Sequence, residues 1–575
     1  MIFLRKVFNR LLILALTLLS VNSHSQVFSQ DWLQGYGSWA TDVGVSICSD
    51  HLNNVYTCGF FSDTLVLNNG EILLSSNGRT DIYLMKQDST GSILWAYSFG
   101  GEDYDGAWMD GFGNVIQLPG EVEVDRDGNV YLIGNFSGIV DFDPGPDNYL
   151  LNSEAALSGF VLKLDAEGSF SYAQVYKGSF ITACITDSSN ALMLAGSFFG
   201  EVDFDLGNDS FILNSNGISQ PFILKLDPNG AFINCRQFVS PEFGSVFHIS
   251  INQVNQQVLV SGVYRQEIAF DTLLANHHIS NGETDCFLAC LNSSFAVLWS
   301  LSIGGPSHDN DAGIVVNNDG VLFGANFREV VQVPVLGVTT TISSNGLADF
   351  LIVRITNSGV ITSVRTFGGR LDDFVSDLGI DLYGNIYLAG TFQDTIKINN
   401  IELINSSYYT SFLLKLDGLL GYSNHFLMVS DHPQGISSIN GISINEENTI
   451  CLTGNYAPRS YFEFDNINSA ITSYGRYDIF NAQIKHNQTP LNAQNFIEEN
   501  KLLLFPNPSI DEVTIYAEDE INSIRIFDSI GGKVFYSTSK LSNRSQKINI
   551  SGGAGIYYLL VNTNFGIYTK KIVKL

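Results

Sequence analysis

The sequence predicts an all-β protein, a seven-bladed β-propeller followed by a small Ig-like β-sandwich. Three observations favour this fold. An apolar strand that runs into a Gly and an aromatic residue occurs seven times, at spacings of 62 to 75 residues. A second apolar strand, which ends in "KLD" or a variant of it, follows each copy. Within the copies, apolar residues alternate with a period of two, which is typical of strands.

The two markers count the repeats independently. The first is centred on Gly59, Gly134, Gly196, Gly262, Gly324, Gly390 and Gly454, and the second ends at Asp88, Asp165, Asp227, Asn292, Thr356, Asp417 and Lys485. Each unit has four strand-like runs, which matches one propeller blade, and a closed ring protects strand edges that an open stack would expose. A β-solenoid usually has shorter rungs, and a string of small sandwiches would need linkers, so the propeller is favoured over both.

The N-terminus predicts a signal peptide over residues 1–25. Three basic residues precede an apolar run of about eleven residues, Leu11 to Val21. Ser23 and Ser25 then place small residues before a cut between Ser25 and Gln26. A membrane anchor is the alternative, but spanning a bilayer takes about 20 apolar residues. No later segment is long and apolar enough, so we expect no transmembrane segment in the mature chain.

Composition excludes several classes of protein. The 575 residues carry a formal net charge of −29, which argues against nucleic acid as a partner because phosphate contacts need Lys and Arg. Charged residues make up only 15%, which excludes coiled coils and charged helical bundles. The seven cysteines are scattered, so they predict buried small apolar side chains and no disulfide scaffold.

The predicted propeller, residues 26–488, resembles the SBBP-type bacterial β-propeller repeat over about Gln30 to Gln488. The match is carried by "DVGVSICSDHLNNVYTCGFF" from Asp42, by "SSNGRTDIYLMKQDSTGSILWAYSFGG" from Ser75, and by "VDFDPG" and "VDFDLG" from Val140 and Val202. The departures are local. A closing Trp is found only at Trp95 and Trp299, and a closing Gly-Gly only at Gly100-Gly101, Gly304-Gly305 and Gly368-Gly369. An insertion at 107–121 in the second unit predicts a protruding loop.

The last part of the chain differs in charge and pattern. Residues 498–575 hold 8 acidic and 9 basic residues, whereas residues 26–497 hold 50 acidic and 17 basic ones. The polar stretch 489–497 reads as a linker. Alternating strands with turn signals follow it, which indicates a small sandwich over residues 498–575.

This C-terminal segment resembles the type A C-terminal sorting domain of the type IX secretion system of Bacteroidetes. The matching residues are the Pro506-Asn507-Pro508 opening, "IRIFDSIGGKV" from Ile524, and the Gly555 to Tyr557 step. An Ig-like binding module would explain the sandwich but not its place at the chain end. The resemblance implies a tag read by the outer-membrane translocon, and a protein that is secreted or attached to the outer cell surface.

Acidic turns are the candidate metal ligands. "DRDGN" holds Asp125 and Asp127, and two similar turns hold the remaining candidates, Asp141, Asp143, Asp203 and Asp205. Calcium prefers such oxygen ligands, but none of these turns has the spacing of a complete EF-type loop. Turn formation, in which Asp bonds its own backbone, is the favoured interpretation, with structural calcium as the alternative. No other cofactor is predicted.

No catalytic constellation is evident. The closest pair of histidines, His277-His278, lacks a third ligand or a neighbouring acid in sequence, and no nucleophile elbow is present. We therefore expect a binding or adhesion module for a glycan or a surface protein, not an enzyme. An extracellular carbohydrate-active enzyme and a purely structural surface protein remain as alternatives.

Overall fold

The computed structural model describes residues 28–486 and 502–574 with gaps. In the first range the gaps are 68–69, 110–114, 119, 155–156, 318–319, 399–400, 406, 431 and 464–469; in the second they are 506–511, 518–520, 529–532, 538–544, 551–552, 554 and 564–565. The predicted cleavage residues Ser25 and Gln26 and the Pro506-Asn507-Pro508 motif lie outside the described residues. Among the described residues, no helix is long and apolar enough to cross a membrane.

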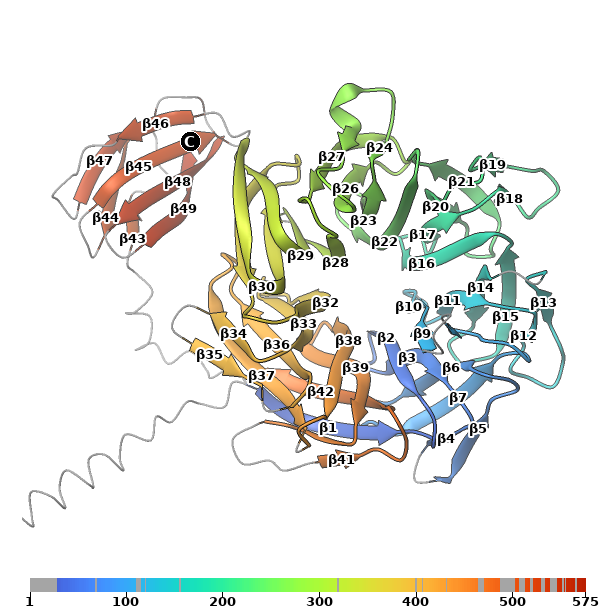
Figure 1. Cartoon of the computed structure of the whole chain (residues 1–575). Helices are drawn as coiled ribbons and strands as arrows, with labels where there is room; N and C mark the ends of the chain where they lie inside the picture. The colour runs from blue at the N-terminus through green and yellow to red at the C-terminus, as the bar shows by residue number, and fades with distance from the viewer. Residues whose placement is uncertain are drawn as a thin grey trace, which may run out of the picture.

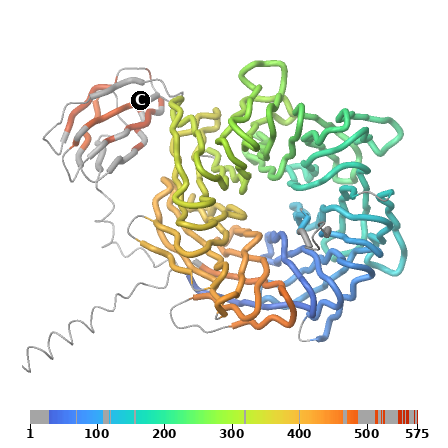
Figure 2. The backbone as a smooth tube through the Cα atoms, in the orientation of Figure 1, coloured from blue at the N-terminus to red at the C-terminus, as the bar shows by residue number. Residues whose placement is uncertain are grey.

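The first range forms seven antiparallel sheets arranged in a ring, six of four strands and one of six, as Figures 1 and 2 show, and four strands of each sheet make one blade. From the inner to the outer strand, blades 1 to 3 are β2 (Val43–Ser49), β3 (Val55–Phe61), β6 (Asp81–Gln87) and β7 (Ile93–Phe99); β10 (Glu121–Val124), β11 (Val130–Phe136), β14 (Ser158–Leu164) and β15 (Phe170–Tyr176); and β16 (Ser179–Thr186), β17 (Leu192–Phe198), β20 (Gln220–Leu226) and β21 (Phe232–Gln237). The two sequence markers are the second and third strands of each blade. The predicted seven-bladed propeller is confirmed.

The remaining blades keep this order. Blades 4 to 7 are β22 (Phe243–Asn252), β23 (Gln257–Arg265), β26 (Asp285–Leu291) and β27 (Val297–Ile303); β28 (Asn310–Asn317), β29 (Gly320–Val335), β30 (Val338–Ile355) and β31 (Ile361–Phe367); β32 (Asp373–Ile380), β33 (Ile386–Phe392), β36 (Thr410–Leu416) and β37 (Tyr422–Ser430); and β38 (Ile436–Ile444), β39 (Thr449–Ala457), β42 (Asp478–His486) and β1 (Phe28–Tyr36). Each inner strand contacts the inner strand of the next blade, and β38 contacts β2, so the ring is closed.

The N-terminal strand closes the last blade. β1 pairs antiparallel with β42, from Phe28 opposite His486 to Tyr36 opposite Ile479. This corrects one expectation, because Trp32 lies on β1 at the position that Trp95 and Trp299 occupy in their blades. A third closing Trp therefore exists, and it is displaced to the far end of the repeat region.

A short hairpin joins the second and third strands of most blades. These hairpins are β4 (Thr64–Leu67) with β5 (Ile72–Ser75), β12 (Ile139–Asp141) with β13 (Leu150–Asn152), β18 (Glu201–Asp203) with β19 (Ile212–Asn214), β24 (Glu267–Ala269) with β25 (His277–Ile279), β34 (Thr395–Ile398) with β35 (Ile401–Ile404), and β40 (Arg459–Phe462) with β41 (Ala470–Thr472). A 3₁₀ turn, Leu274–Asn276, precedes β25. In blade 5 the long strands β29 and β30 continue into the hairpin.

The hydrophobic core lies between neighbouring blades. One cluster joins Tyr56 and Leu84 of blade 1 to Leu132, Phe136 and Phe160 of blade 2, all at most 1% exposed. The "VDFD" motif contributes to this core, because its Phe142 is fully buried against Phe136 and Phe160. All seven cysteines are free, as the sequence predicts.

The insertion in the second unit forms a hairpin of β8 (Ala107–Met109) and β9 (Val115–Gln117), next to β10 in Figure 1. Its ends do not protrude. Ala107 is fully buried against Val43 and Phe60, and Leu118 is 5% exposed. The apolar side chains at its ends thus pack between blades, and the protruding loop stays a prediction because the tip, residues 110–114, lies outside the described residues.

The C-terminal segment forms two antiparallel sheets. One contains β43 (Leu502–Phe505), β44 (Glu512–Ala517) and β47 (Ser545–Asn549), and the other contains β46 (Lys533–Ser537), β45 (Ile521–Asp528), β48 (Gly555–Thr563) and β49 (Gly566–Lys574). One buried cluster takes side chains from both sheets, among them Val513 and Ile548 of the first and Ile526 and Leu559 of the second. A small two-sheet sandwich results.

Candidate functional site

One face of the ring, here called the turn face, carries the turns between the first and second and between the third and fourth strands of each blade. Antiparallel strands place these two turns at the same end. An Asx residue opens every first turn: Asp50, Asp125, Asp187, Asn252, Asn317, Asp381 and Asn445. The hairpins that follow the second strands occupy the opposite face, here called the hairpin face.

Asp125 shows what these residues do. Its Oδ1 accepts hydrogen bonds from the backbone N–H groups of Asp127 at 3.0 Å and Asn129 at 2.9 Å, and its Oδ2 accepts one from Asn129 Nδ2 at 2.8 Å. Asp127 contacts the next blade, since its Oδ2 accepts a hydrogen bond from Asn190 Nδ2 at 2.6 Å. The Asp125 carboxylate thus bonds its own turn, and the Asp127 carboxylate bonds the corresponding turn of the next blade.

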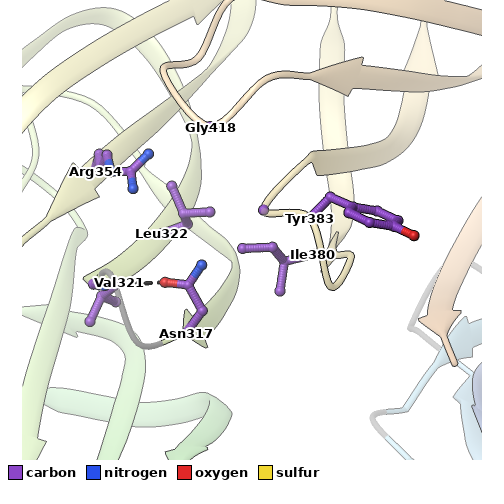
Figure 3. A pocket seen from close by; sticks show the side chains of 9 residues that line it. Asn317, Val321, Leu322, Arg354, Ile380, Tyr383 and Gly418 are labelled. Carbon is purple, nitrogen blue, oxygen red and sulfur yellow. Dashed lines mark hydrogen bonds between the residues drawn. The ribbon is translucent and has the colours of Figure 1, made fainter. Parts of the chain in front are cut away.

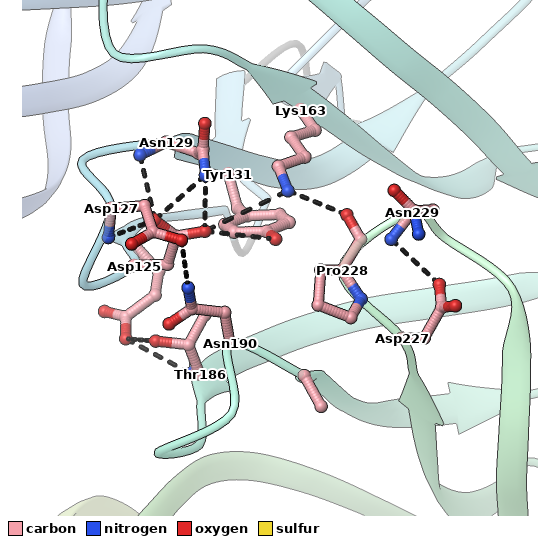
Figure 4. Close-up of polar contacts among 12 residues, drawn as sticks. Asp125, Asp127, Asn129, Tyr131, Lys163, Thr186, Asn190, Asp227, Pro228 and Asn229 are labelled. Carbon is pink, nitrogen blue, oxygen red and sulfur yellow. Dashed lines mark hydrogen bonds and ion pairs between the residues drawn. The ribbon is translucent and has the colours of Figure 1, made fainter.

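Lys163 lies in the junction between blades 2 and 3 on the turn face (Figure 4). Its Nζ donates to the Pro228 carbonyl at 2.7 Å, lies 4.9 Å from the ring centre of Tyr131, and is 3.9 Å from Asp125 Oδ2. Burial lowers the pKa of Lys163, and the neighbouring carboxylate of Asp125 opposes this. The lysine therefore links the first turn of its own blade to the second turn of the next.

At three other junctions, a side chain also donates to the carbonyl that corresponds to that of Pro228 in the next blade's turn. Lys86 Nζ donates to the Ala166 carbonyl at 3.1 Å. The indole nitrogens of two closing tryptophans do likewise, Trp299 to Asn357 at 3.0 Å and Trp32 to Ser89 at 3.3 Å. A side-chain N–H thus reaches the second residue of the next blade's turn at four junctions.

The junction between blades 5 and 6 differs, because it contains a pocket of about 90 Å³ (Figure 3). Arg354 replaces the lysine, and Gly418 stands where Ala166 and Pro228 stand in the earlier turns. Among the described residues, no hydrogen bond or ion pair involves the Arg354 guanidinium. The pocket is lined by Asn317, Gly320, Val321, Leu322, Arg354, Ile380, Tyr383, Gly384 and Gly418.

Glycines keep this pocket open. A Cβ on Gly418 would lie 3.4 Å from the Gly384 carbonyl oxygen and 3.7 Å from Arg354 Nη1, so any side chain there would enter the space. Gly384 has a φ of +80°, which side chains rarely adopt. Tyr383 stands at the rim and is 64% exposed. The result is an apolar floor with one guanidinium in its wall.

The other predicted ligands lie on the hairpin face. Asp141 Oδ1 accepts from the backbone of Asp143 at 3.1 Å and of Tyr149 at 2.8 Å, and Asp203 Oδ1 bonds Asp205 and Phe211 at 3.1 and 2.8 Å. Asp143 and Asp205 each bond a glycine N–H two residues on. The structure thus does not bring the candidates together, and no group of three metal-ligating side chains occurs among the described residues. Calcium stays a prediction.

Sequence reasoning missed buried aspartate pairs on the hairpin face. At the junction of blades 5 and 6, Gly369 N–H donates to Asp373 Oδ2 at 2.6 Å, and Gly368 lies against the Asp349 carboxyl. Burial raises the pKa of Asp373 to about 8 and also raises that of Asp349. Corresponding pairs are Asp81 with Asp105, Asp285 with Asp309, and Asp478 with Asp42. The three Gly-Gly steps of the sequence were the available signal.

The inner strands carry further carboxylates that the sequence did not reveal. Glu121 accepts from the backbone of Cys184 at 2.7 Å, and Asp377 from that of Ile442 at 2.9 Å, both in the next blade. Burial raises the pKa of Glu121 to about 8. These groups satisfy backbone donors between blades, and the alternating "EVEV" was their only trace in the sequence.

The described part of the sorting motif sits at the start of β48. Gly555 is exposed, whereas Tyr557 is 5% exposed in the core, and its hydroxyl donates to the Gly553 carbonyl at 2.7 Å. Residues 503–575 match the family of secretion system C-terminal sorting domains. The chain carries a secretion sorting domain. The protein is therefore a cargo of the type IX secretion system, exported to be secreted or attached to the cell surface.

The propeller has distant structural likenesses. PorZ, a surface component of the type IX secretion system of Porphyromonas gingivalis, aligns at 11% identity over 92% of this chain and 81% of its own, with a TM-score of 0.23. A puromycin hydrolase aligns at 10% identity over 82% and 58%, with a TM-score of 0.38. Synechocystis apocarotenoid oxygenase aligns at 12% identity over 80% and 95%, with a TM-score of 0.35. No curated protein matches the chain. Likenesses this weak do not bear on function.

Proposed function

We propose that this exported protein is a binding module, and that its propeller takes an extracellular glycan or surface protein at the pocket between blades 5 and 6. The observation that carries the proposal is the open junction itself. At the corresponding position of four other junctions, a side-chain N–H closes the gap to the next turn. At this one, the Arg365 guanidinium bonds the Leu420 carbonyl further along the turn, and Arg354 lines a pocket.

The scaffold suits such a role. Hydrogen bonds between neighbouring turns, such as Asn445 Nδ2 to Asn53 Oδ1 at 2.8 Å and the Leu382 N–H to Asn448 Oδ1 at 3.0 Å, hold the turn face in place. A site on rigid elements loses little conformational entropy on binding. The pocket combines the apolar side chains of Val321, Leu322 and Ile380 with the polar ones of Asn317 and Arg354.

A carbohydrate-active enzyme is the second function class that the sequence left open. Catalysis of glycoside cleavage needs two carboxyl groups that flank one bond. The buried carboxylates described above each bond backbone N–H groups, and none of them lines the pocket. Binding therefore has more support than catalysis.

Capture from the native surface would test the proposal. The full chain, immobilised, is incubated with extracellular polysaccharide and outer-membrane protein fractions, and the retained material is compared with that retained by its Arg354→Ala variant. We expect at least one component that only the unchanged chain retains. Identical captures by both chains would contradict a binding role for this pocket.

Delivery is tested separately. A chain that ends at residue 497 should remain inside the outer membrane, because it lacks the sorting domain, and cell fractionation would show it. If it reaches the surface at the normal level, the domain is not the export signal.

A further inference from the structure

We propose that the pocket between blades 5 and 6 binds a uronate, the carboxylate-bearing sugar of an acidic polysaccharide, through the Arg354 guanidinium. This inference rests on the proposed binding function and names its ligand class. Three features support it: a cation without a described partner, neighbouring carboxylates that bond their own turns, and a space of limited size.

The cation is the Arg354 guanidinium. Lysines at the same strand position in blades 2 and 3 are used internally, since Lys163 bonds the Pro228 carbonyl and Lys225 Nζ lies 2.7 Å from Asp187 Oδ2. Arg354 is half-buried, and its guanidinium has no hydrogen bond or ion pair with any residue that the structure describes. A guanidinium without a described partner attracts an anion locally, and this attraction has to exceed the repulsion from a chain of net charge −29.

The nearest turn carboxylates do not neutralise it. Asp381 Oδ1 accepts from the N–H groups of Tyr383 at 2.9 Å and Asn385 at 2.8 Å. Asp417 Oδ1 accepts from those of Leu419 at 2.9 Å and Gly421 at 2.6 Å. The Oδ1 atoms of both carboxylates thus bond their own turns, and neither carboxylate forms an ion pair with Arg354 among the described residues. Residues 318–319, in the turn after Asn317, lie outside the described residues.

The space selects among anions. A planar carboxylate matches the guanidinium with two parallel hydrogen bonds. The floor of Val321, Leu322 and Ile380 is apolar, which suits the C–H face of a sugar ring, and the exposed ring of Tyr383 points away from these side chains (Figure 3). About 90 Å³ admits an acid group and one edge of a ring.

Calorimetric titration of the full chain with a galacturonate tetramer tests the proposal. A neutral oligosaccharide and a sulfated one of equal length serve as comparison ligands. We expect the galacturonate to bind and Arg354→Ala to weaken its binding at least tenfold.

Arg354→Lys should give an intermediate loss of affinity, because it keeps the charge without the paired donors. Gly418→Ala should also weaken binding by entering the pocket. Arg370→Ala, an exposed arginine at the other end of the junction, removes the same charge and should change nothing.

Each outcome is decisive. Thermal midpoints should agree among all five chains, so that lost binding is not lost folding. Binding of the galacturonate that survives Arg354→Ala would overturn the site. Preference for the sulfated ligand, or Arg354-dependent binding of polyglutamate that exceeds the galacturonate, would overturn the uronate assignment. If the chain ignores all acidic ligands yet retains another glycan or protein through Arg354, the inference fails and the binding function stands; if it retains nothing, both fail.

Discussion

The junctions between blades 2 and 3 and between blades 5 and 6 have the same strands in the same order, yet the first is closed and the second open on the turn face. Lys163 crosses the first to the Pro228 carbonyl, with Tyr131 and Asp125 beside it. In the second, Arg354 and Gly418 hold the equivalent positions and leave a pocket. One propeller thus supplies both a structural junction and a candidate site. The two differ at four of these repeat positions, where Arg354, Gly418, Leu322 and Asn317 correspond to Lys163, Pro228, Tyr131 and Asp125.

On the hairpin face, the same two junctions differ in their ionisable groups. Between blades 5 and 6, Asp349 and Asp373 are fully buried around a Gly-Gly step. Between blades 2 and 3, a short connection lets Gly178 N–H donate to Ser158 Oγ at 3.4 Å, and the Gly178 carbonyl accepts from Phe199 at 2.8 Å. Neutral groups replace the acid pair there. The open junction therefore carries ionisable groups that the closed one lacks.

The largest contrast is expected from removing the two cations. Lys163→Ala should lower the free energy of unfolding by about 3 kcal/mol, because it strands the buried Asp125 carboxylate and the Pro228 carbonyl. Arg354→Ala should cost less than about 0.5 kcal/mol, as expected for a side chain without partners. Urea denaturation of both variants measures the difference. Equal losses would make Arg354 a structural residue and abolish the contrast.

A smaller effect is expected from pH. The pKa of Asp373 is raised in the fold, so the folded state holds its proton more tightly than the unfolded chain does. Its contribution to stability is full below about pH 4 and is lost as pH rises toward 8, by on the order of 1 kcal/mol per pH unit at most. Asp373→Asn keeps an acceptor for Gly369 and should flatten this slope. Thermal midpoints between pH 5 and 8 test it; parallel curves for the two chains would contradict it.

Pro228→Gly should have a still smaller effect, about 1 kcal/mol of lost stability, because glycine gives the unfolded chain more freedom at a turn where proline is already fitted. Lys163 would keep its carbonyl partner. Calorimetric melting measures the loss, and Leu419→Ala, at an exposed turn position of the open junction, is the control with no expected change. A loss above about 3 kcal/mol would mean that the turn depends on more than proline.

The smallest expected effect is that of a chelator. Since Asp125, Asp141 and Asp203 bond the backbone of their own turns, removal of calcium should leave the thermal midpoint unchanged. A clear fall in the midpoint with chelator, reversed by added calcium, would instead support the structural calcium alternative.

Repeat counting predicted the fold well because each blade carries its own apolar markers. It did not predict contacts between segments that are far apart in the sequence. The strand with Trp32 belongs to the last blade, and only ring closure places it beside Gln483, 451 residues away. The aspartate pairs likewise join two blades, although the Gly-Gly steps recorded them locally.

The pocket lay further from prediction, because its lining comes from four separate segments of blades 5 and 6. The sequence held two traces of it: Arg354 in place of the lysine of "KLD", and Gly418 after Asp417. Neither trace has meaning until the next blade is placed beside it. The acidic turns were the predicted ligands instead, since closely spaced Asp residues resemble a set of metal ligands even when their oxygens accept hydrogen bonds from the backbone.

A glycan-array comparison of the full chain with its Arg354→Ala variant tests the central claim most directly, that an exported propeller binds through the pocket between blades 5 and 6. We predict signals concentrated on uronate-bearing glycans, and their loss in the variant while its thermal midpoint stays unchanged. Signals of equal strength in both chains, or an array without signals, would contradict the claim.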